Sequence, residues 1–501
     1  AGYYTSNNAK EDYNFIKSDS VWDESSGEAS YKNRKSGQPF FHVQNFGGTH
    51  EGQLHFTQAQ MDSVKTKTFQ ENVSVFPYHP DTPLYRYTNA YYRDLHQKVD
   101  MQIGEFLKEL EEDGLMENTI IFYYGDHGGV LPRSKGYTYE SGLNVPMVVY
   151  VPEKWKHLAP TKMGSRTDAF VQFIDLAPTV LNLAGVDISE QIDGKPFLGK
   201  TVTEDNLIGR NTTFGYADRF DEKYDLVRSI RKGKYKYIRN YQPFNIDALF
   251  NFYRYKMLAY KEWQQLFKDG KLNEEQEQFF KARTPEALYD IEKDPHEIHN
   301  LAPDGAYEET LKELRSNLQQ QVKSMPDLSF YPESYFLEAG LSNPVAFGQQ
   351  HKSEIAALMD IADLSLNSFD ESKEEIEKAL KSDNPWKRYW GLIVCSSFGK
   401  EASEFYKIAE QMSKEDKENL VCIRAVEFLM LNKQNVSNDL ILEIVKNSKS
   451  ETETNLILNS ITLIKTVKSD FKINIPKTMF PPEWYDKEGD LVNRRIDFIN
   501  E

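Results

Sequence analysis

The chain has 501 residues, of which 39% are hydrophobic and 13% aromatic, so it can bury at least two hydrophobic cores. Its formal net charge of −17 argues against nucleic acid or an anionic membrane surface as a general partner. We expect no membrane span, because no apolar run is long enough. Cys395 and Cys422 are too few for a disulfide framework; they could pair, but small buried thiols fit their helical patterns better.

The first predicted strand lies over residues 39–46 (PFFHVQNF) and leads through paired glycines to His50. In an open parallel α/β sheet, ligands collect outside the carboxyl ends of the strands. His50 is therefore a candidate functional residue, although a lone histidine after a strand can also be a polar turn residue.

Residues 91–113 form the next predicted element, an amphipathic helix that ends at Gly114. Its apolar face is defined by residues spaced three and four apart, namely Leu95, Val99, Ile103, Phe106 and Leu110. A strand over 119–124 follows, and another over 147–151, before a helical segment over 168–185 that restarts at Asp175. This alternation predicts βαβ units and an α/β domain.

An acid and an imidazole stand side by side where the predicted strand over 119–124 ends. Asp126 and His127 are flanked by glycines, which allow the backbone to turn so that both side chains face one ion. Lys135 follows on the same loop, where it could meet an anion bound at that metal. An isolated Asp-His-Gly triplet is more often an ordinary turn, so the longer pattern decides the interpretation.

From about residue 206 the pattern changes to a predicted hairpin, with strands over 226–230 and 235–239 joined at Gly233. A helix is predicted over 307–323. Arg219, Arg239 and Tyr241 are candidates for substrate contact, and charges that stabilise the surface of the sheet are an equal alternative.

Residues 329–348 are rich in proline, glycine and aromatic residues, which predicts a linker or wrapping segment. Helices are then predicted over 372–381, 385–398, 414–431 and 452–466. The joints near Ser382, Ser413 and Ser448 recur at 31 and 35 residues, a spacing typical of stacked helical hairpins such as HEAT repeats. Aromatic residues at helical spacing usually belong to a core, while a sugar-stacking patch is the alternative here for Trp386, Tyr389 and Trp390.

Two long motifs give the chain a family resemblance. The string from Asp126 to Gly142 (DHGGVLPRSKGYTYESG) resembles the second metal-binding motif of the sulfatases, within the alkaline-phosphatase superfamily. The run from Leu288 to Leu301 (LYDIEKDPHEIHNL) resembles the closing motif of their C-terminal subdomain. The resemblance covers about residues 1–325.

The resemblance implies an α/β fold, an alkaline-phosphatase-like sandwich with a parallel sheet, a small α+β subdomain and a C-terminal all-α helical-repeat domain. The expected division is a catalytic domain over 1–205, a C-terminal sulfatase subdomain over 206–328, a linker over 329–350, helical repeats over 351–470 and a tail over 471–501.

The resemblance also assigns roles. Asp126 and His127 would bind one divalent cation, most often Ca²⁺ in this family, with Mg²⁺ or Mn²⁺ as alternatives because imidazole is an unusual ligand for Ca²⁺. Lys10 and Lys135 would neutralise sulfate oxygens, and His50 would position the sulfate or protonate the leaving alkoxide. Arg219, Arg239 and Tyr241 lie in the subdomain that the family places beside the cleft. Asp12 stands where many relatives have a histidine, which removes one expected hydrogen bond to the nucleophile.

Sulfatases use a formylglycine made from the Cys or Ser of a Cys/Ser-x-Pro-Ser-Arg motif. This motif does not occur in the 501 residues, so we expect the front of the catalytic domain to be missing and this chain alone to be inactive.

The resemblance favours hydrolysis of sulfate esters on a sulfated carbohydrate by an exported, periplasmic or extracellular protein. The alternatives are a phosphoester or phosphonate hydrolase of the same superfamily, and a non-catalytic scaffold that binds a protein partner, or a second copy of itself, through its helices.

Overall fold

The computed structural model describes residues 2–13, 15–487 and 489–501. The chain forms two compact units. The N-terminal unit contains the residues up to Ser74 together with Arg86–Gly125 and Pro146–Asn211. The C-terminal unit contains Val75–Tyr85, Asp126–Val145 and Thr212–Glu501. The segment that begins at Asp126 therefore belongs to the C-terminal unit, although the strand before it belongs to the other.

The N-terminal unit contains a parallel sheet with β1 (Tyr4–Asn8) between β2 (Glu24–Ser26) and β3 (Phe40–Gln44). Most of α2 (Pro83–Glu112) lies in the same unit, and its predicted apolar face is buried at Leu95, Val99 and Leu110. The predicted α/β class with a parallel sheet is confirmed.

The next two strands of this unit depart from the predicted βαβ pattern. β4 (Ile121–Tyr124) pairs with β5 (Met147–Tyr150) in antiparallel register rather than with a strand of the parallel sheet. One face of this pair contacts a small core around Phe197 and Leu198. The helices of the unit are short apart from α2: α1 (Gln58–Ser63), α4 (Leu176–Leu183) and α5 (Glu204–Ile208).

The C-terminal unit is built on an antiparallel sheet in the order β6 (Thr212–Phe220), β7 (Lys223–Lys232), β8 (Tyr235–Asn240) and β9 (Glu286–Asp290). The predicted hairpin is confirmed, with Lys232 opposite Tyr235 and Gly233 in the left-handed conformation that the turn requires. α8 (Glu308–Ser324) packs on β7 and β8 and buries its leucines, as its periodicity predicts. α6 (Leu258–Lys268) and strand β6 were not predicted from the sequence.

The region predicted as a linker over 329–350 is helical. α9 (Glu333–Gly340) follows Pro332, and α10 (Pro344–Gln350) begins with a proline whose missing N–H costs nothing in the first helical turn. The predicted helix over 414–431 is two helices that meet at Asp416. Further helices of the described chain are α3 (Glu140–Leu143), α7 (Glu274–Glu277), α11 (Lys352–Asp363), α12 (Phe369–Leu380), α13 (Pro385–Phe398), α14 (Tyr406–Glu415), α15 (Asn419–Leu431), α16 (Asn438–Lys446), α17 (Glu451–Val467) and α18 (Leu491–Asn500).

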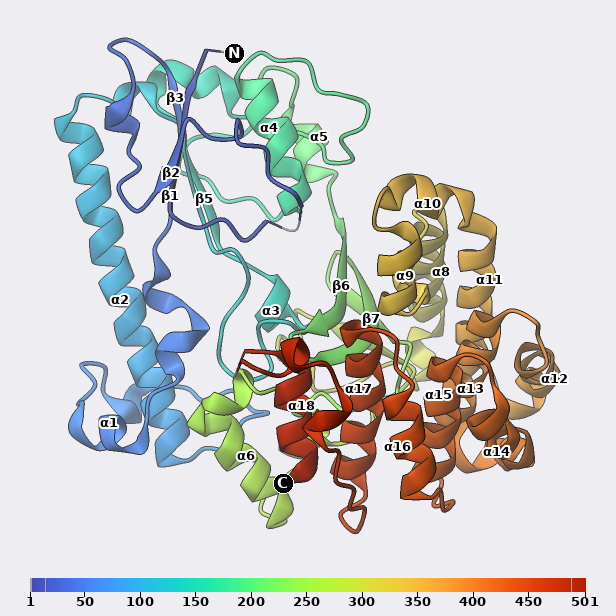
Figure 1. The fold of residues 1–501 in the computed structure, drawn as a ribbon. Coiled ribbons are helices and arrows are strands. Elements are labelled where there is room, and N and C mark those ends of the chain that lie inside the picture. Colours follow the sequence, from blue (N-terminus) through green and yellow to red (C-terminus); the bar gives the residue numbers. More distant parts are fainter. Residues whose placement is uncertain (1, 14, 488) are drawn as a thin grey trace. The chain divides into compact units, whose positions relative to one another are not determined.

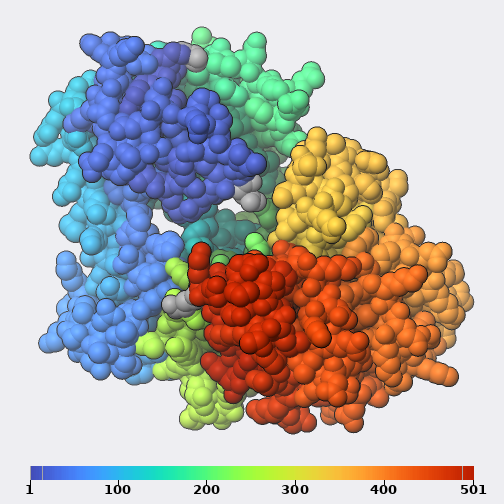
Figure 2. Space-filling model, viewed as in Figure 1, coloured from blue at the N-terminus to red at the C-terminus, as the bar shows by residue number. Residues whose placement is uncertain are grey.

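Helices α11 to α18 pack side by side and continue the hydrophobic core of the β6–β9 sheet (Figure 1). α13 contacts α11, α12 and α15, and α17 contacts α15, α16 and α18. In the space-filling view this region is one continuous surface in orange and red (Figure 2). The HEAT-like repeat remains a prediction, although joints do fall near Ser382, Ser413 and Ser448.

The aromatic residues at the start of α13 are core residues, because Trp386, Tyr389 and Trp390 are at most 6% exposed. Cys395 and Cys422 are unpaired, buried thiols, as expected. Within the described residues, none of the helices combines the length and the apolar character that crossing a membrane requires.

Candidate active site

The segment from Asp126 to Leu143 folds back on itself through backbone hydrogen bonds between glycine-containing stretches. Gly128 N donates to Gly142 O at 2.9 Å, and Gly129 N donates to Ser141 O at 2.8 Å. The approach is too close for a side chain, since a Cβ on Gly128 would lie 2.3 Å from Ser141 O. The glycines of this motif are therefore needed because two backbone stretches touch here. The sequence analysis explained them only as residues that allow the backbone to turn.

Asp126 and His127 lie together at the start of this segment. Asp126 Oδ1 is 3.5 Å from His127 Nε2, and the two side chains are 65% and 26% exposed. His127 Nδ1 lies 2.8 Å from Gly128 O, so in the tautomer with the proton on Nδ1 this nitrogen donates to the carbonyl and Nε2 is the acceptor. A backbone partner on the opposite ring nitrogen is the usual support of a metal-binding histidine.

This donor pair fits two positions of a divalent-cation site. One carboxylate oxygen and one imidazole nitrogen 3.5 Å apart can both reach an ion at metal–ligand distances of about 2.0–2.6 Å. Across the part of the chain that the structure describes, no third His, Cys, Asp or Glu completes a cluster with them. Asp126 and His127 are therefore two candidate ligands, and the rest of the site stays a prediction.

Lys135 is held on the same segment by its backbone. Lys135 N donates to Gly129 O at 2.9 Å, and Arg254 Nη2 donates to Lys135 O at 2.7 Å. The Lys135 ammonium lies 5.8 Å from the centre of the Phe220 ring on β6. The structure therefore brings Lys135 onto the same glycine-closed loop as the Asp126–His127 pair.

A buried ion cluster anchors the end of this segment to the sheet. Glu140 pairs with Lys236 at 3.0 Å and with Arg231, while Lys236 also pairs with Glu297 at 3.1 Å. Glu297 Oε2 accepts a hydrogen bond from Glu140 N at 2.5 Å. Burial works against ionisation of Glu140, but Lys236 and Arg231 outweigh it and lower the pKa of its carboxyl. Burial raises the pKa of Glu297.

Arg133 fixes the middle of the segment. Its guanidinium lies between the rings of Tyr78 and Tyr139, 4.4 Å and 3.6 Å from their centres. It donates to His296 O and Glu297 O, each at 2.8 Å. These contacts hold the Asp126–Leu143 segment in place. They come from the backbone and the Glu297 carboxylate of the run Leu288–Leu301, which the sequence analysis identified as a closing motif.

Lys10 and His50 lie in the N-terminal unit, on loops that leave the same edge of its parallel sheet. β1 ends at Asn8 opposite Gln44, the last residue of β3, so both loops begin at neighbouring carboxyl ends. Lys10 Nζ is 3.3 Å from Asp12 Oδ2. His50 Nδ1 accepts a hydrogen bond from Gly52 N at 3.1 Å. His50 follows the carboxyl end of β3, as predicted.

The three candidate substrate contacts of the C-terminal unit differ in exposure. Arg219 is 41% exposed and lies 3.6 Å from Glu333. Arg239 and Tyr241 are 2% and 1% exposed. Arg239 binds Asp363 and Ala362 O of α11, Ser365 Oγ and Pro285 O, and the Tyr241 ring packs against Phe330 and Trp390. Because both side chains are buried in these contacts, Arg219 is the exposed member of the three.

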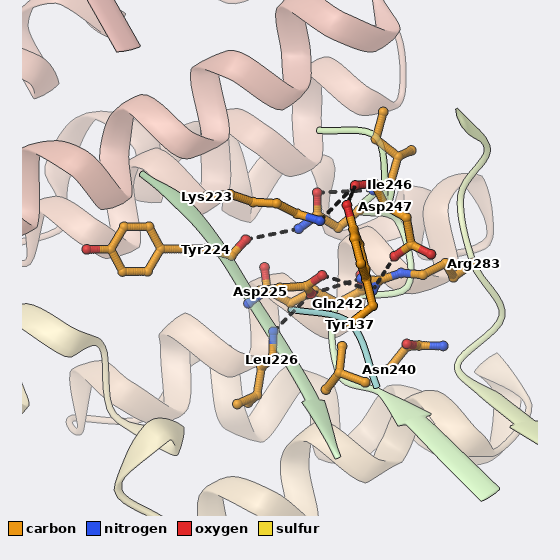
Figure 3. A network of polar contacts seen from close by, with 12 residues as sticks. Tyr137, Lys223, Tyr224, Asp225, Leu226, Asn240, Gln242, Ile246, Asp247 and Arg283 are labelled. Carbon is orange, nitrogen blue, oxygen red and sulfur yellow. Dashed lines mark hydrogen bonds and ion pairs between the residues drawn. The ribbon is translucent and has the colours of Figure 1, made fainter. Parts of the chain in front are cut away.

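A cavity of about 40 Å³ lies against the residues that follow Lys135. Gly136 and Arg219 line it, together with charged groups that the sequence analysis did not single out, namely Lys223, Asp225, Asp247, Arg254 and Arg283. Figure 3 shows Tyr137, Lys223 and Arg283 gathered around Asp247. No sequence signal could have found them, because they are single charged residues on strands and loops far apart in the chain.

Comparison with known proteins gives matches over the N-terminal half. Residues 2–186 match the sulfatase family model, and residues 125–278 match the model of the C-terminal part of N-sulphoglucosamine sulphohydrolase. The chain is 36% identical to a ulvan-active sulfatase of Formosa agariphila over 67% of its own length and 60% of that protein. It is 26% identical to human N-sulphoglucosamine sulphohydrolase over 48% of each chain.

A solved structure in complex with its substrate D-glucosamine-2-N,6-O-disulfate aligns with a TM-score of 0.41 and 16% identity, covering 64% of this chain and 80% of that one. The chain spans 60% of the length of the ulvan-active sulfatase and about half that of human N-sulphoglucosamine sulphohydrolase. Residues 2–278 of the chain are thus similar in sequence to sulfatases.

Proposed function

We propose that this chain is part of a sulfatase that hydrolyses sulfate esters on a sulfated carbohydrate such as a polysaccharide. The observation that carries the proposal is the Asp126–His127 pair, whose Oδ1 and Nε2 atoms lie 3.5 Å apart on a loop closed by glycine contacts. The similarity of residues 2–278 to sulfatases supports it. So does the similarity to a ulvan-active sulfatase.

Asp126 and His127 would hold one divalent cation, for which Ca²⁺ is our first choice and Mg²⁺ or Mn²⁺ the alternatives. When bound, the ion would polarise a sulfate oxygen and hold the nucleophile. Gly128 O, 2.8 Å from His127 Nδ1, would orient the ring so that Nε2 can serve as the metal ligand.

Lys135 and Lys10 would place positive charge beside the sulfate oxygens, where it stabilises the charge that develops as the ester bond breaks. The backbone contacts of Lys135 to Gly129 and Arg254 hold this cation on a fixed loop. His50 would position the sulfate or donate a proton to the leaving alkoxide. Arg219, which is exposed on β6, would contact the carbohydrate.

The nucleophile proposed for this reaction is a formylglycine that lies outside the 501 residues, because no Cys/Ser-x-Pro-Ser-Arg motif occurs within them. Loss of a nucleophile can lower turnover by about a million-fold, so these residues alone are expected to be inactive. We further propose an exported protein, periplasmic or extracellular, since a polysaccharide substrate is met outside the cytoplasm.

The test uses the protein expressed from its complete gene, with sulfate release from ulvan and from sulfated glucosamine measured by ion chromatography. Asp126→Ala and His127→Ala should each lower sulfate release by at least about 100-fold and weaken calcium binding measured by calorimetry. His157→Ala is the matched control, because His157 is an exposed histidine outside the motif, and it should leave both unchanged.

Two results would overturn the proposal. Release of phosphate from a phosphomonoester or phosphonate without release of sulfate would assign the site to phosphoryl chemistry. Absence of turnover on both substrate types, with no calcium binding by the complete protein, would leave the scaffold interpretation.

A further inference from the structure

The cavity in the C-terminal unit contains a buried lysine that the proposed mechanism does not use. Lys223 lies on β7 and is 5% exposed. Its ammonium donates one hydrogen bond, to Asp247 O at 2.9 Å, and lies 4.9 Å from the centre of the Tyr137 ring. Among the described residues, these are the hydrogen bond and the ring contact of the Lys223 ammonium. An ammonium has three N–H donors, so most of its donor capacity is unused.

A second donor in the same cavity has no partner. Arg283 uses its terminal nitrogens on Asp225, Asp247 and Gln242 O, at 2.9–3.3 Å. Its Nε atom is buried and makes no hydrogen bond within the described structure. Figure 3 shows Lys223 and Arg283 approaching Asp247 from opposite directions. A buried donor without a partner is destabilising, so the structure leaves room for a missing acceptor.

The charged groups that line the cavity are Arg219, Lys223, Arg254 and Arg283 together with Asp218, Asp225 and Asp247. Arg219 and Asp218 also pair with residues outside the cavity lining, Glu333 and Arg228. The cavity volume of about 40 Å³ exceeds the 10–15 Å³ that one water molecule needs and is sufficient for a single small ion. Its size excludes a sugar ring.

We propose that this cavity binds one small monovalent inorganic anion, of the size of chloride, between Lys223 and Arg283. The anion would supply an acceptor for the unused donors of Lys223 Nζ and Arg283 Nε. Because Gly136, Tyr137 and Tyr139 form one wall, the bound anion would also brace the segment that carries Lys135. This site is separate from the Asp126–His127 pair and does not depend on the sulfatase function.

The binding should depend on pH. Burial lowers the pKa of Lys223 to about 8, partly offset by Asp225 and Asp247 and reinforced by Arg254 and Arg283. The other titratable groups around the cavity are Asp218, Arg219, Tyr137, Tyr139 and Tyr289, and the pKa of each tyrosine is raised by burial. An anion prefers the protonated lysine, so its apparent affinity should fall about tenfold per pH unit once the pH exceeds the pKa of Lys223 in the occupied site.

The first experiment is a crystal of the chain grown with bromide in place of chloride. We expect one anomalous difference peak inside the cavity, within hydrogen-bonding distance of Lys223 Nζ. A cavity that contains only water would show no anomalous peak and would overturn the proposal. This measurement uses the unmodified chain, so it stands even if a variant fails to fold.

The second experiment measures thermal stability in sodium chloride and in sodium gluconate at equal ionic strength. Chloride should raise the melting temperature of the wild type in a saturable manner, and Lys223→Met should lose this response. Lys232→Met is the matched control on the same strand, because Lys232 is half-exposed and pairs with Glu313 at the surface. An equal chloride response in Lys223→Met and wild type would contradict the proposal, as would no response in the wild type.

Discussion

Lys236 Nζ lies 3.1 Å from Glu297 Oε1, and both side chains are only 1% exposed. This contact joins β8 to the turn after β9. Lys236 also holds Glu140 at 3.0 Å, so a single ammonium connects two carboxylates that come from sequence motifs 157 residues apart. The position of the Asp126–Leu143 segment on the sheet therefore depends on an ion cluster as well as on apolar packing.

We predict that Lys236→Met lowers the free energy of unfolding by about 3–5 kcal/mol, because it leaves two buried carboxylates without their shared cation. Urea unfolding followed by circular dichroism measures the change. The control is Lys232→Met, whose pair with Glu313 is at the surface and should contribute about 1 kcal/mol or less. Equal effects of the two variants would show that burial of the cluster does not matter.

We predict that Gly142→Ala distorts the Asp126–Leu143 segment, since the new Cβ would lie 2.3 Å from Ser134 O and 2.7 Å from Tyr137 O. The stability should fall by about 2 kcal/mol or more, and calcium binding should weaken with it. Gly104→Ala is the control, because its Cβ on α2 would meet no atom within 4 Å and should stabilise the helix by up to about 1 kcal/mol. A Gly142→Ala variant with wild-type stability would refute the close contact.

We predict that the protein loses stability as the pH falls because His79 is buried. This side chain is 1% exposed, its Nε2 lies 2.8 Å from Pro132 O, and its Nδ1 has no partner among the described residues. Burial lowers the pKa of His79 to about 3 from its usual 6.5. Between those values the unfolded chain binds the proton and the folded chain does not, so stability falls as the pH drops, by up to about 5 kcal/mol in total.

Denaturant unfolding of the wild type, His79→Gln and His157→Gln from pH 7 to pH 4 tests this expectation. The glutamine can keep the hydrogen bond to Pro132 O but cannot take up a proton in this range. The pH dependence should therefore be shallower in His79→Gln than in the wild type. Exposed His157 serves as the control and should not alter the slope; identical slopes for all three proteins would contradict the prediction.

We predict that Arg495→Met loosens the attachment of α18. The Arg495 side chain is fully buried and donates to Glu222 O, Phe250 O and Asn459 Oδ1 at 2.6–3.1 Å. The substitution removes the donors to Glu222 O and Phe250 O and one of the two donors to Asn459 Oδ1, which should cost about 3 kcal/mol. Hydrogen exchange should show faster exchange in α18 and at Tyr224 N, whereas Lys477→Met, which removes a surface pair with Asp497, should leave both unchanged.

The sequence by itself determined those elements whose periodicity or turn chemistry is local. The hairpin around Gly233, helix α13 and the apolar face of α2 follow from patterns within one element, and the structure has them. The Asp126–His127 pair was visible for the same reason, since adjacent residues remain adjacent after folding. Local signals also misled, because the prolines of the predicted linker begin helices α9 and α10.

Tertiary structure alone decided which charged residues meet. Lys236, Glu140 and Glu297 form one cluster, and Lys223, Asp247 and Arg283 surround one cavity, although their spacing in the chain follows no period. Tertiary structure also decided that Arg239 is buried by helix α11, while Arg219 on the same sheet remains exposed. The physical reason is that burial of a charge depends on partners brought from distant segments, and a sequence pattern records only what lies within a few residues.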